Sequence, residues 1–169
     1  MVAIAILDDY QQVALKMADW SRLQADHKIT VFHEPFPDED AVVRALAGFE
    51  VVCLMRERTP FPASLIERLP ELRLIVTSGS RNAAIDIAAA SKRGVLVCGT
   101  ETPGHSTAEL TMGLMLSLAR SIHSEAAAMR AGGWQTTIGR DLRGKTLGLI
   151  GLGRLGGEVA KFGQAFGMK

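Results

Sequence analysis

The 169-residue sequence predicts an α/β fold with two domains: a parallel-sheet domain over residues 1–100 and the beginning of a second domain over residues 101–169. Three observations predict it. Short runs rich in Val and Ile alternate with helix-like segments through the first 100 residues. A long helical stretch without a strand then begins at Ser106, and a strand, a glycine-rich turn and a helix follow from Lys145 onward.

Five short apolar runs are predicted to be buried strands of one parallel sheet, at residues 3–7, 30–32, 51–55, 74–77 and 95–97. Apolar residues at helical spacing predict helices between them, at residues 11–24, 38–47, 62–69 and 85–93. Pro62 suits the first turn of its helix, and Gly94 suits the stop after Arg93. This repetition predicts helices on both faces of the sheet and a five-stranded, flavodoxin-like layout.

Residues 106–131 predict one long helix that is apolar over much of its circumference. Leu110, Leu114 and Leu118 form an apolar row beside small residues that also recur every four positions. Two interpretations stay open. The helix packs inside this molecule, or it is shared with a second subunit in a homodimer.

Composition and charge exclude several classes of protein. Lys+Arg 19 against Asp+Glu 18 leaves a net charge of +1 and no basic footprint for nucleic acid or anionic lipid. The longest apolar stretch, residues 110–119, is too short to span a membrane, and residues 1–7 do not resemble a secretory leader. Cys53 and Cys98 are too far apart for a paired-cysteine motif. We therefore expect a cytoplasmic protein without nucleic-acid or membrane partners.

A glycine-rich turn lies between the last predicted strand, residues 145–150, and a predicted helix over residues 155–166. Its sequence is Gly151-Leu152-Gly153-Arg154-Leu155-Gly156. At this spacing Gly151 permits the tight turn, Gly153 lets a diphosphate approach the backbone, and Gly156 lets helix and strand pack closely. The start of the helix favours an anion. The turn predicts the beginning of a Rossmann dinucleotide-binding domain; a glycine turn without a ligand is the alternative.

The carboxylate that binds the adenosine ribose is expected about 20 residues beyond such a turn, at the end of the next strand. Lys169 is 13 residues beyond Gly156, and no strand is predicted between them. The strand at residues 145–150 would then have two unpaired edges. We therefore expect a truncated product, or a sheet that something outside this chain completes.

Two candidate anion-binding loops follow neighbouring strands. Arg56 comes after the third strand, and Ser78, Gly79, Ser80 and Arg81 come after the fourth. A guanidinium binds a carboxylate in a forked geometry, and amides around a glycine can form an anion-binding nest. Because the carboxyl ends of parallel strands meet at one rim, the pair favours a ligand site. The alternatives are a solvated loop and an ordinary turn with Asn82 as a helix cap.

The remaining polar residues give weaker signals. His27, His33 and His123 lack metal-ligand spacing, so no metal site is predicted. Thr107 lies in the first turn of the long helix, where capping alone would explain it. Asp8 and Asp9 are adjacent on a strand, so their side chains are expected to point to opposite faces.

The chain resembles the D-isomer-specific 2-hydroxyacid dehydrogenases, a family of nicotinamide-dependent enzymes. The segments that carry the resemblance are Met55-Arg56-Glu57-Arg58-Thr59, Arg93-Gly94-Val95-Leu96-Val97, Ser106-Thr107-Ala108-Glu109-Leu110, and residues 142–156. It implies two lobes with a cleft between them, and usually a dimer formed through the cofactor lobes. It also implies that the Ser78–Ser80 amides receive a substrate carboxylate, that Thr107 lies near the nicotinamide, and that the Arg154 and Leu155 amides bind the diphosphate. Where Arg81 stands the family often has glycine, so this loop is bulkier and more cationic.

The resemblance further implies hydride transfer between NAD or NADP and a small 2-hydroxy or 2-oxo acid. The family's catalytic Arg, Glu and His belong to a later part of the cofactor lobe, and no residue here matches them. We therefore expect the 169-residue chain to be inactive alone. One alternative is a non-catalytic module of the same family that associates through the helix at residues 106–131. A standalone flavodoxin-like domain ranks last, because it leaves residues 145–169 without a purpose.

Overall fold

The computed structural model describes residues 1–101 and 104–169. The chain divides into two compact units, a first unit over Met1–Thr102 and a second unit over Pro103–Lys169. Among the described residues, no helix has the length and apolar character that crossing a membrane requires.

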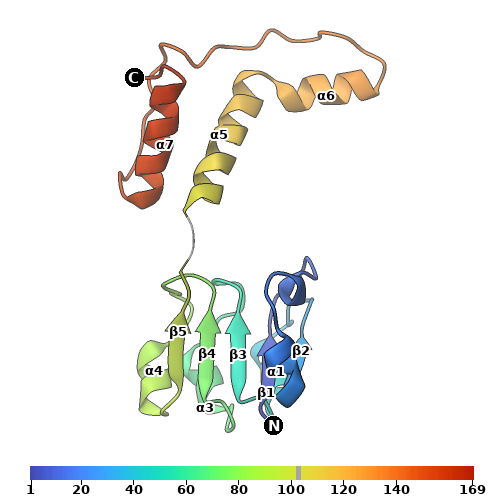
Figure 1. Ribbon diagram of the computed structural model, residues 1–169, viewed down its shortest axis with the longest axis vertical. Coiled ribbons are helices and arrows are strands. Elements are labelled where there is room, and N and C mark those ends of the chain that lie inside the picture. The colour runs from blue at the N-terminus through green and yellow to red at the C-terminus, as the bar shows by residue number, and fades with distance from the viewer. Residues whose placement is uncertain (102–103) are drawn as a thin grey trace. The chain divides into compact units, whose positions relative to one another are not determined.

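The first unit is built on a five-stranded parallel sheet (Figure 1). Its strands are β1 (Ala3–Ile6), β2 (Lys28–Val31), β3 (Val51–Leu54), β4 (Leu74–Thr77) and β5 (Leu96–Gly99). They are hydrogen-bonded in the order β2-β1-β3-β4-β5, and every neighbouring pair is parallel. The predicted flavodoxin-like layout is thereby confirmed, and the loops that leave all five strands lie at one edge of the sheet.

Three helices cover one face of this sheet: α2 (Glu39–Leu46), α3 (Ala63–Glu67) and α4 (Ile87–Lys92). Their buried side chains and alternate residues of the central strands form the core, which includes Val52, Leu54, Ile75, Leu46, Leu65, Ile66 and Ala90. Strands β3 and β4 bury every second residue fully and the others only partly. The expectation of strands buried on both faces is therefore wrong for these two, because the other face has lighter cover. It is also wrong for β2 and β5 at the two edges of the sheet, in which no residue is fully buried.

The single helix predicted over residues 11–24 is wrong. The segment holds a short 3₁₀ turn, η1 (Ala14–Lys16), and a separate helix, α1 (Ser21–Asp26), none of whose residues is fully buried. The buried Asp9 carboxylate accepts the N–H groups of Val13 and Ala14, each at 3.0 Å, and so caps the 3₁₀ turn. The Trp20 indole then donates to Ala14 O at 3.0 Å. These two side chains stabilise a compact turn where periodicity alone predicts a helix.

The second unit contains α5 (His105–Ala119), α6 (Ile122–Arg130) and α7 (Arg154–Ala165), and α5 packs along α7. The prediction of one helix over residues 106–131 is wrong, because the helix breaks between α5 and α6. Ser121 adopts the left-handed conformation there, with φ of 52°. For a non-glycine residue this costs roughly 1–2 kcal/mol, and the apolar pattern of the flanking turns gives no sign of it.

The predicted strand at residues 145–150 is not present as a regular strand. Its beginning pairs with the last residue: Leu147 N donates to Lys169 O and Lys169 N donates to Lys145 O, each at 2.8 Å. This is the bonding pattern of a parallel ladder. The expectation that nothing in the chain pairs with this segment is therefore also wrong, although Ile150 at its far end is fully exposed.

Candidate functional site

The loop after β4 carries four of the predicted anion-binding residues. Gly79 has φ of 100°, a conformation that glycine adopts without strain. The Ser78 amide donates to Leu54 O at 3.0 Å, and the Gly79 amide donates to Thr100 Oγ1 at 3.0 Å. Of the three amides expected to receive a carboxylate, that of Ser78 is therefore committed to the sheet and that of Gly79 to the Thr100 hydroxyl. Within the described part of the chain, the Ser80 amide has no acceptor.

Ser80 and Arg81 are exposed and line a hollow of about 430 Å³. Its other walls include Ile85, Ile87 and Val97, so a guanidinium lies beside apolar surface. Gly99, the last residue of β5, lies directly beneath the loop: a Cβ there would come within 2.7 Å of Gly79 O and 3.1 Å of Ser80 Cα. The hollow combines a cation with an apolar wall, which suits a small acid with a hydrocarbon group.

The loop after β3 contains two arginines with different surroundings. Arg56 has φ of 58°, and its side chain is 58% exposed, with Nε 3.7 Å from a Glu57 carboxylate oxygen. Arg58 donates to Asp8 O at 2.6 Å, and its guanidinium carbon lies 4.7 Å from the centre of the Tyr10 ring. Arg58 is thus held on the end of β1 by a hydrogen bond and a cation–π contact.

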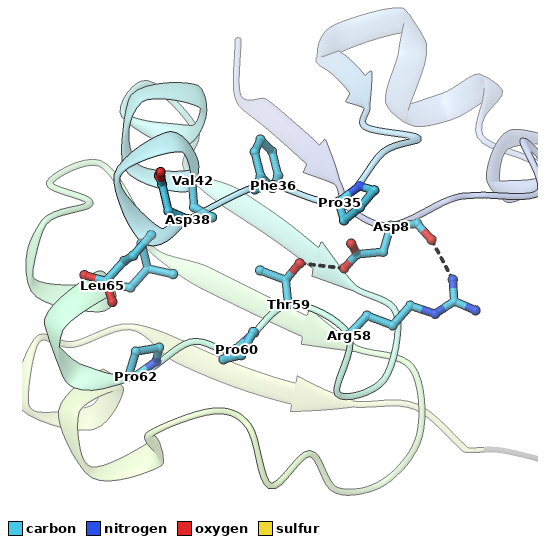
Figure 2. A pocket seen from close by; sticks show the side chains of 11 residues that line it. Asp8, Pro35, Phe36, Asp38, Val42, Arg58, Thr59, Pro60, Pro62 and Leu65 are labelled. Atoms are coloured by element: carbon cyan, nitrogen blue, oxygen red, sulfur yellow. Dashed lines mark hydrogen bonds between the residues drawn. The ribbon is translucent and has the colours of Figure 1, made fainter.

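Asp8 follows β1 and is the buried anchor of this edge (Figure 2). Its carboxylate accepts from Thr59 Oγ1 at 2.8 Å and from the Tyr10 hydroxyl at 3.2 Å. Figure 2 shows this carboxylate beside Thr59 on a cavity of about 250 Å³, whose walls include Phe36 and Pro60. The bonds that join Asp8 to Thr59 and Asn82 to Arg56 could not be found from sequence, because these partners lie 51 and 26 positions apart along the chain.

Asp9 has a different role from its neighbour. Burial alone would raise the pKa of its carboxyl, but the Val13 and Ala14 amides, together with His33 and Lys16, hold that pKa below its usual range. Each carboxylate accepts hydrogen bonds from its own set of donors, Thr59 and Tyr10 for Asp8 and two backbone amides for Asp9, so the two aspartates do not form an acid–base pair. Among the residues described, no three His, Cys, Asp or Glu side chains gather as metal ligands.

The three motif glycines of the second unit occupy three different environments. Gly151 has φ of 89°. A Cβ on Gly156 would collide with Gly151 O, whereas a Cβ on Gly153 would meet no atom within 4 Å. Gly157 N donates to Gly153 O at 2.7 Å as α7 begins. The positions match the expected turn, close packing and open approach, so the residues present fit a dinucleotide diphosphate at the start of α7.

The helix starts of α5 and α7 adjoin within the second unit. A Cβ on Gly104, which caps α5, would lie 3.4 Å from Leu155 Cδ2 and 3.5 Å from Arg154 Nε. Thr107 is exposed in the first turn of α5, as predicted from its position. Two positive helix ends therefore lie together, which favours a bound anion.

Comparison with known proteins agrees with this geometry. Residues 112–169 match the model for the D-isomer specific 2-hydroxyacid dehydrogenase, NAD binding domain. The chain is 41% identical over 119 residues, 69% of its length, to D-3-phosphoglycerate dehydrogenase of Rattus norvegicus. It is 39% identical over 137 residues, 78% of its length, to hydroxypyruvate reductase of Thermotoga maritima. The chain belongs to the D-isomer specific 2-hydroxyacid dehydrogenase family.

A solved structure, phosphoglycerate oxidoreductase from Vibrio cholerae, superimposes on 99% of the chain with a TM-score of 0.90 and 38% identity. The chain spans about half of that structure, 54%, and 22% and 44% of the rat and Thermotoga proteins. The match confirms the α/β class. The dehydrogenase model also covers the glycine turn and α7, which is where the geometry fits a dinucleotide.

Proposed function

We propose that this chain contributes the acid-binding unit and the beginning of the NAD-binding unit of a 2-hydroxyacid dehydrogenase. The observation that carries the proposal is the turn at residues 151–156, with its positive φ at Gly151, its close contact at Gly156 and its open approach at Gly153. The NAD-binding-domain match supports NAD, and NADP is the alternative that the titration below tests. Bound NAD would supply or accept the hydride.

The chain's own residues would bind and orient the two reactants. The backbone amides of Arg154 and Leu155 would bind the diphosphate, and Thr107 would lie near the nicotinamide. Arg56 and the Ser78–Arg81 loop would bind the carboxylate of a small 2-hydroxy or 2-oxo acid, with the hollow beside Arg81 receiving its hydrocarbon group. No residue of this chain matches the family's catalytic Arg, Glu and His. We therefore expect no turnover of pyruvate by the 169-residue chain alone with NADH.

A titration of the ¹⁵N-labelled chain tests the dinucleotide site. We expect NAD or inorganic pyrophosphate to shift the amide resonances of residues 153–156. Gly153→Ala, whose methyl group enters the open space without meeting protein, should weaken binding about tenfold. Because Gly153 is the N-cap of α7, the change should lower the free energy of unfolding by only about 0.5–1 kcal/mol. Gly157→Ala is the matched control, because its methyl group also meets no atom but lies four positions farther along, inside α7. Absence of any shift with NAD, NADP and pyrophosphate would contradict the proposal.

The exposed side of α5 supports a homodimer of the cofactor units. Leu110, Leu114 and Leu118 are 63%, 57% and 73% exposed and form a row at four-residue spacing. The same helix packs along α7 within its own unit. One side of the helix would therefore pack within the molecule and the other against a second copy. Both interpretations of its apolar pattern would then hold, each for a different side of the helix.

Leu114→Glu is expected to convert the dimer into a monomer, because a desolvated carboxylate would be placed in the middle of the leucine row. Light scattering after size exclusion should then report 18.2 kDa in place of twice that mass. Leu23→Glu, at an exposed leucine of the first unit, is the control and should leave the dimer intact. A wild-type chain that is monomeric at high micromolar concentration would contradict this assembly.

A further inference from the structure

The loop after β3 is hydrogen-bonded to both neighbouring strand ends. On the side of β4, Asn82 Nδ2 donates to Arg56 O at 2.7 Å, and Arg56 N donates to Ser78 Oγ at 3.0 Å. On the side of β1, Thr59 and Arg58 donate to the carboxylate and the carbonyl of Asp8 (Figure 2). The loop is therefore attached at its second residue, Arg56, and again at its fourth and fifth, Arg58 and Thr59.

Arg56 is the residue of this loop whose backbone needs support. Its φ of 58° is a left-handed conformation that a long side chain adopts rarely. Both polar groups of its backbone are bound by side chains from the neighbouring loop, the carbonyl by Asn82 and the amide by Ser78. These two hydrogen bonds stabilise the left-handed conformation of Arg56, which an arginine backbone adopts rarely on its own.

Asn82 is itself held in one orientation. Only 8% of the residue is exposed. Its Nδ2 also donates to Thr77 Oγ1 at 2.9 Å, and its Oδ1 accepts from Ala84 N at 2.9 Å. With both amide protons and the carbonyl oxygen used, the side chain links the last residue of β4 to the loop after β3. The Asn82 side chain therefore connects the two predicted anion-binding loops through hydrogen bonds.

Arg56 and Arg58 have different roles in this loop. Arg58 is bound to Asp8 O and lies over Tyr10, so its charge is used in joining the loop to β1. The Arg56 side chain projects from the backbone that Asn82 holds, and it is more than half exposed at the same edge as Ser80 and Arg81. A carboxylate at that edge would meet Arg56 rather than Arg58.

We propose that Asn82 is a positioning residue for acid binding, which holds Arg56 in its left-handed conformation so that the Arg56 guanidinium, and not that of Arg58, receives the substrate carboxylate. This inference rests on the proposed function, because it names the residue that orients a group of that same site. The polar side-chain atoms of Asn82 are used in hydrogen bonds within the protein, so its effect on the substrate carboxylate would pass through the Arg56 backbone.

The test uses the ¹⁵N-labelled chain, Asn82→Leu and pyruvate as the probe. Leucine keeps the shape of the side chain, introduces no charge and removes all three hydrogen bonds. We expect the Arg56 amide order parameter to fall from about 0.85 to below about 0.6. Pyruvate affinity, followed at the Arg56 Nε and Ser80 amide resonances, should fall about tenfold. Thr77→Val, which removes one acceptor of the Asn82 amide, should shift both readouts in the same direction by less and keeps the test possible if the leucine variant fails to fold.

Two comparisons separate positioning from stability and identify the arginine. Val52→Ala destabilises the core away from the loop and should leave pyruvate affinity unchanged at a temperature where the chain stays folded. Arg56→Lys should weaken pyruvate binding with the loop still ordered, whereas Arg58→Lys should leave the contact with pyruvate in place.

The outcomes distinguish this inference from the proposed function. If pyruvate binds wild type and Asn82→Leu equally well, the positioning role is overturned while acid binding stands. If pyruvate shifts no resonance of wild type, acid binding at this edge is overturned, and the inference with it, even where the Arg56 order parameter still falls. Loss of order together with weaker binding supports both.

Discussion

Gly156→Ala is expected to destabilise the second unit by about 3 kcal/mol and to abolish dinucleotide binding. The added methyl group would collide with the carbonyl oxygen of Gly151, and the nearest atoms are backbone, which cannot rotate away. Overpacking by a single methyl group typically costs about 1–3 kcal/mol, and the upper end applies where the backbone must shift. Relief would require α7 to move off the turn, and the turn would then lose the geometry that accepts a diphosphate.

Urea unfolding followed at the second-unit amide resonances measures this effect. Gly157→Ala is the control, because it adds the same methyl group to the next residue of α7, where nothing lies within 4 Å. In a helix interior that change should stabilise by about 0.5–1 kcal/mol. The free energy of unfolding should therefore fall in Gly156→Ala and rise in Gly157→Ala, although the two glycines are adjacent. Equal stability of the two variants would contradict the close packing of Gly156 on Gly151.

Gly99→Ala is expected to displace the loop after β4 and to weaken acid binding at least tenfold. Its methyl group would approach Gly79 O to 2.7 Å and two Ser80 backbone atoms to 3.1 Å. The sheet below Gly99 cannot yield without breaking its pairing with β4, in which Gly99 is the partner of Thr77. The loop must therefore rise, and with it the Ser80 amide. We expect a loss of about 1–3 kcal/mol in the free energy of unfolding.

Chemical shifts of the Gly79 and Ser80 amides, together with a pyruvate titration, would measure that displacement. Gly48→Ala is the control in the same unit, because a Cβ at Gly48 has no atom within 4 Å. It should change stability by less than about 0.5 kcal/mol and leave pyruvate binding unaltered. Unchanged Ser80 shifts in Gly99→Ala would show that the loop does not rest on β5.

Much of the first unit could be predicted from sequence, because its strands are short and separated by clear breaks. Gly94, with φ of 72°, ends the turn before β5 as its position indicates. Asp38 and Asp86 cap α2 and α4 by accepting the amides of Ala41 and Ala89. Each of these features depends on residues within a few positions of one another, so patterns in the local sequence predict them.

The failures occur where distant or irregular contacts decide the backbone. The buried Asp9 replaces a helix with a 3₁₀ turn, and the left-handed Ser121 divides a helix whose apolar pattern is continuous. In the candidate site, Arg56 was predicted as an anion-binding residue, and its exposure agrees with that role. Its support by Asn82 depends on the pairing of β3 with β4, which no local pattern reveals.

The two-sided attachment of the loop after β3 also bears on how this protein folds. Its bonds join residues that are 22 positions apart, as Arg56 and Ser78 are, up to 51 positions apart, as Thr59 and Asp8 are. Each bond closes a long loop of chain, and closing that loop costs conformational entropy. The hydrogen bonds offset this cost only when the three strands already lie together. If the loop binds an acid as proposed, its binding conformation would thus form late, after assembly of the sheet, because residue 82 must already be in place beside Arg56.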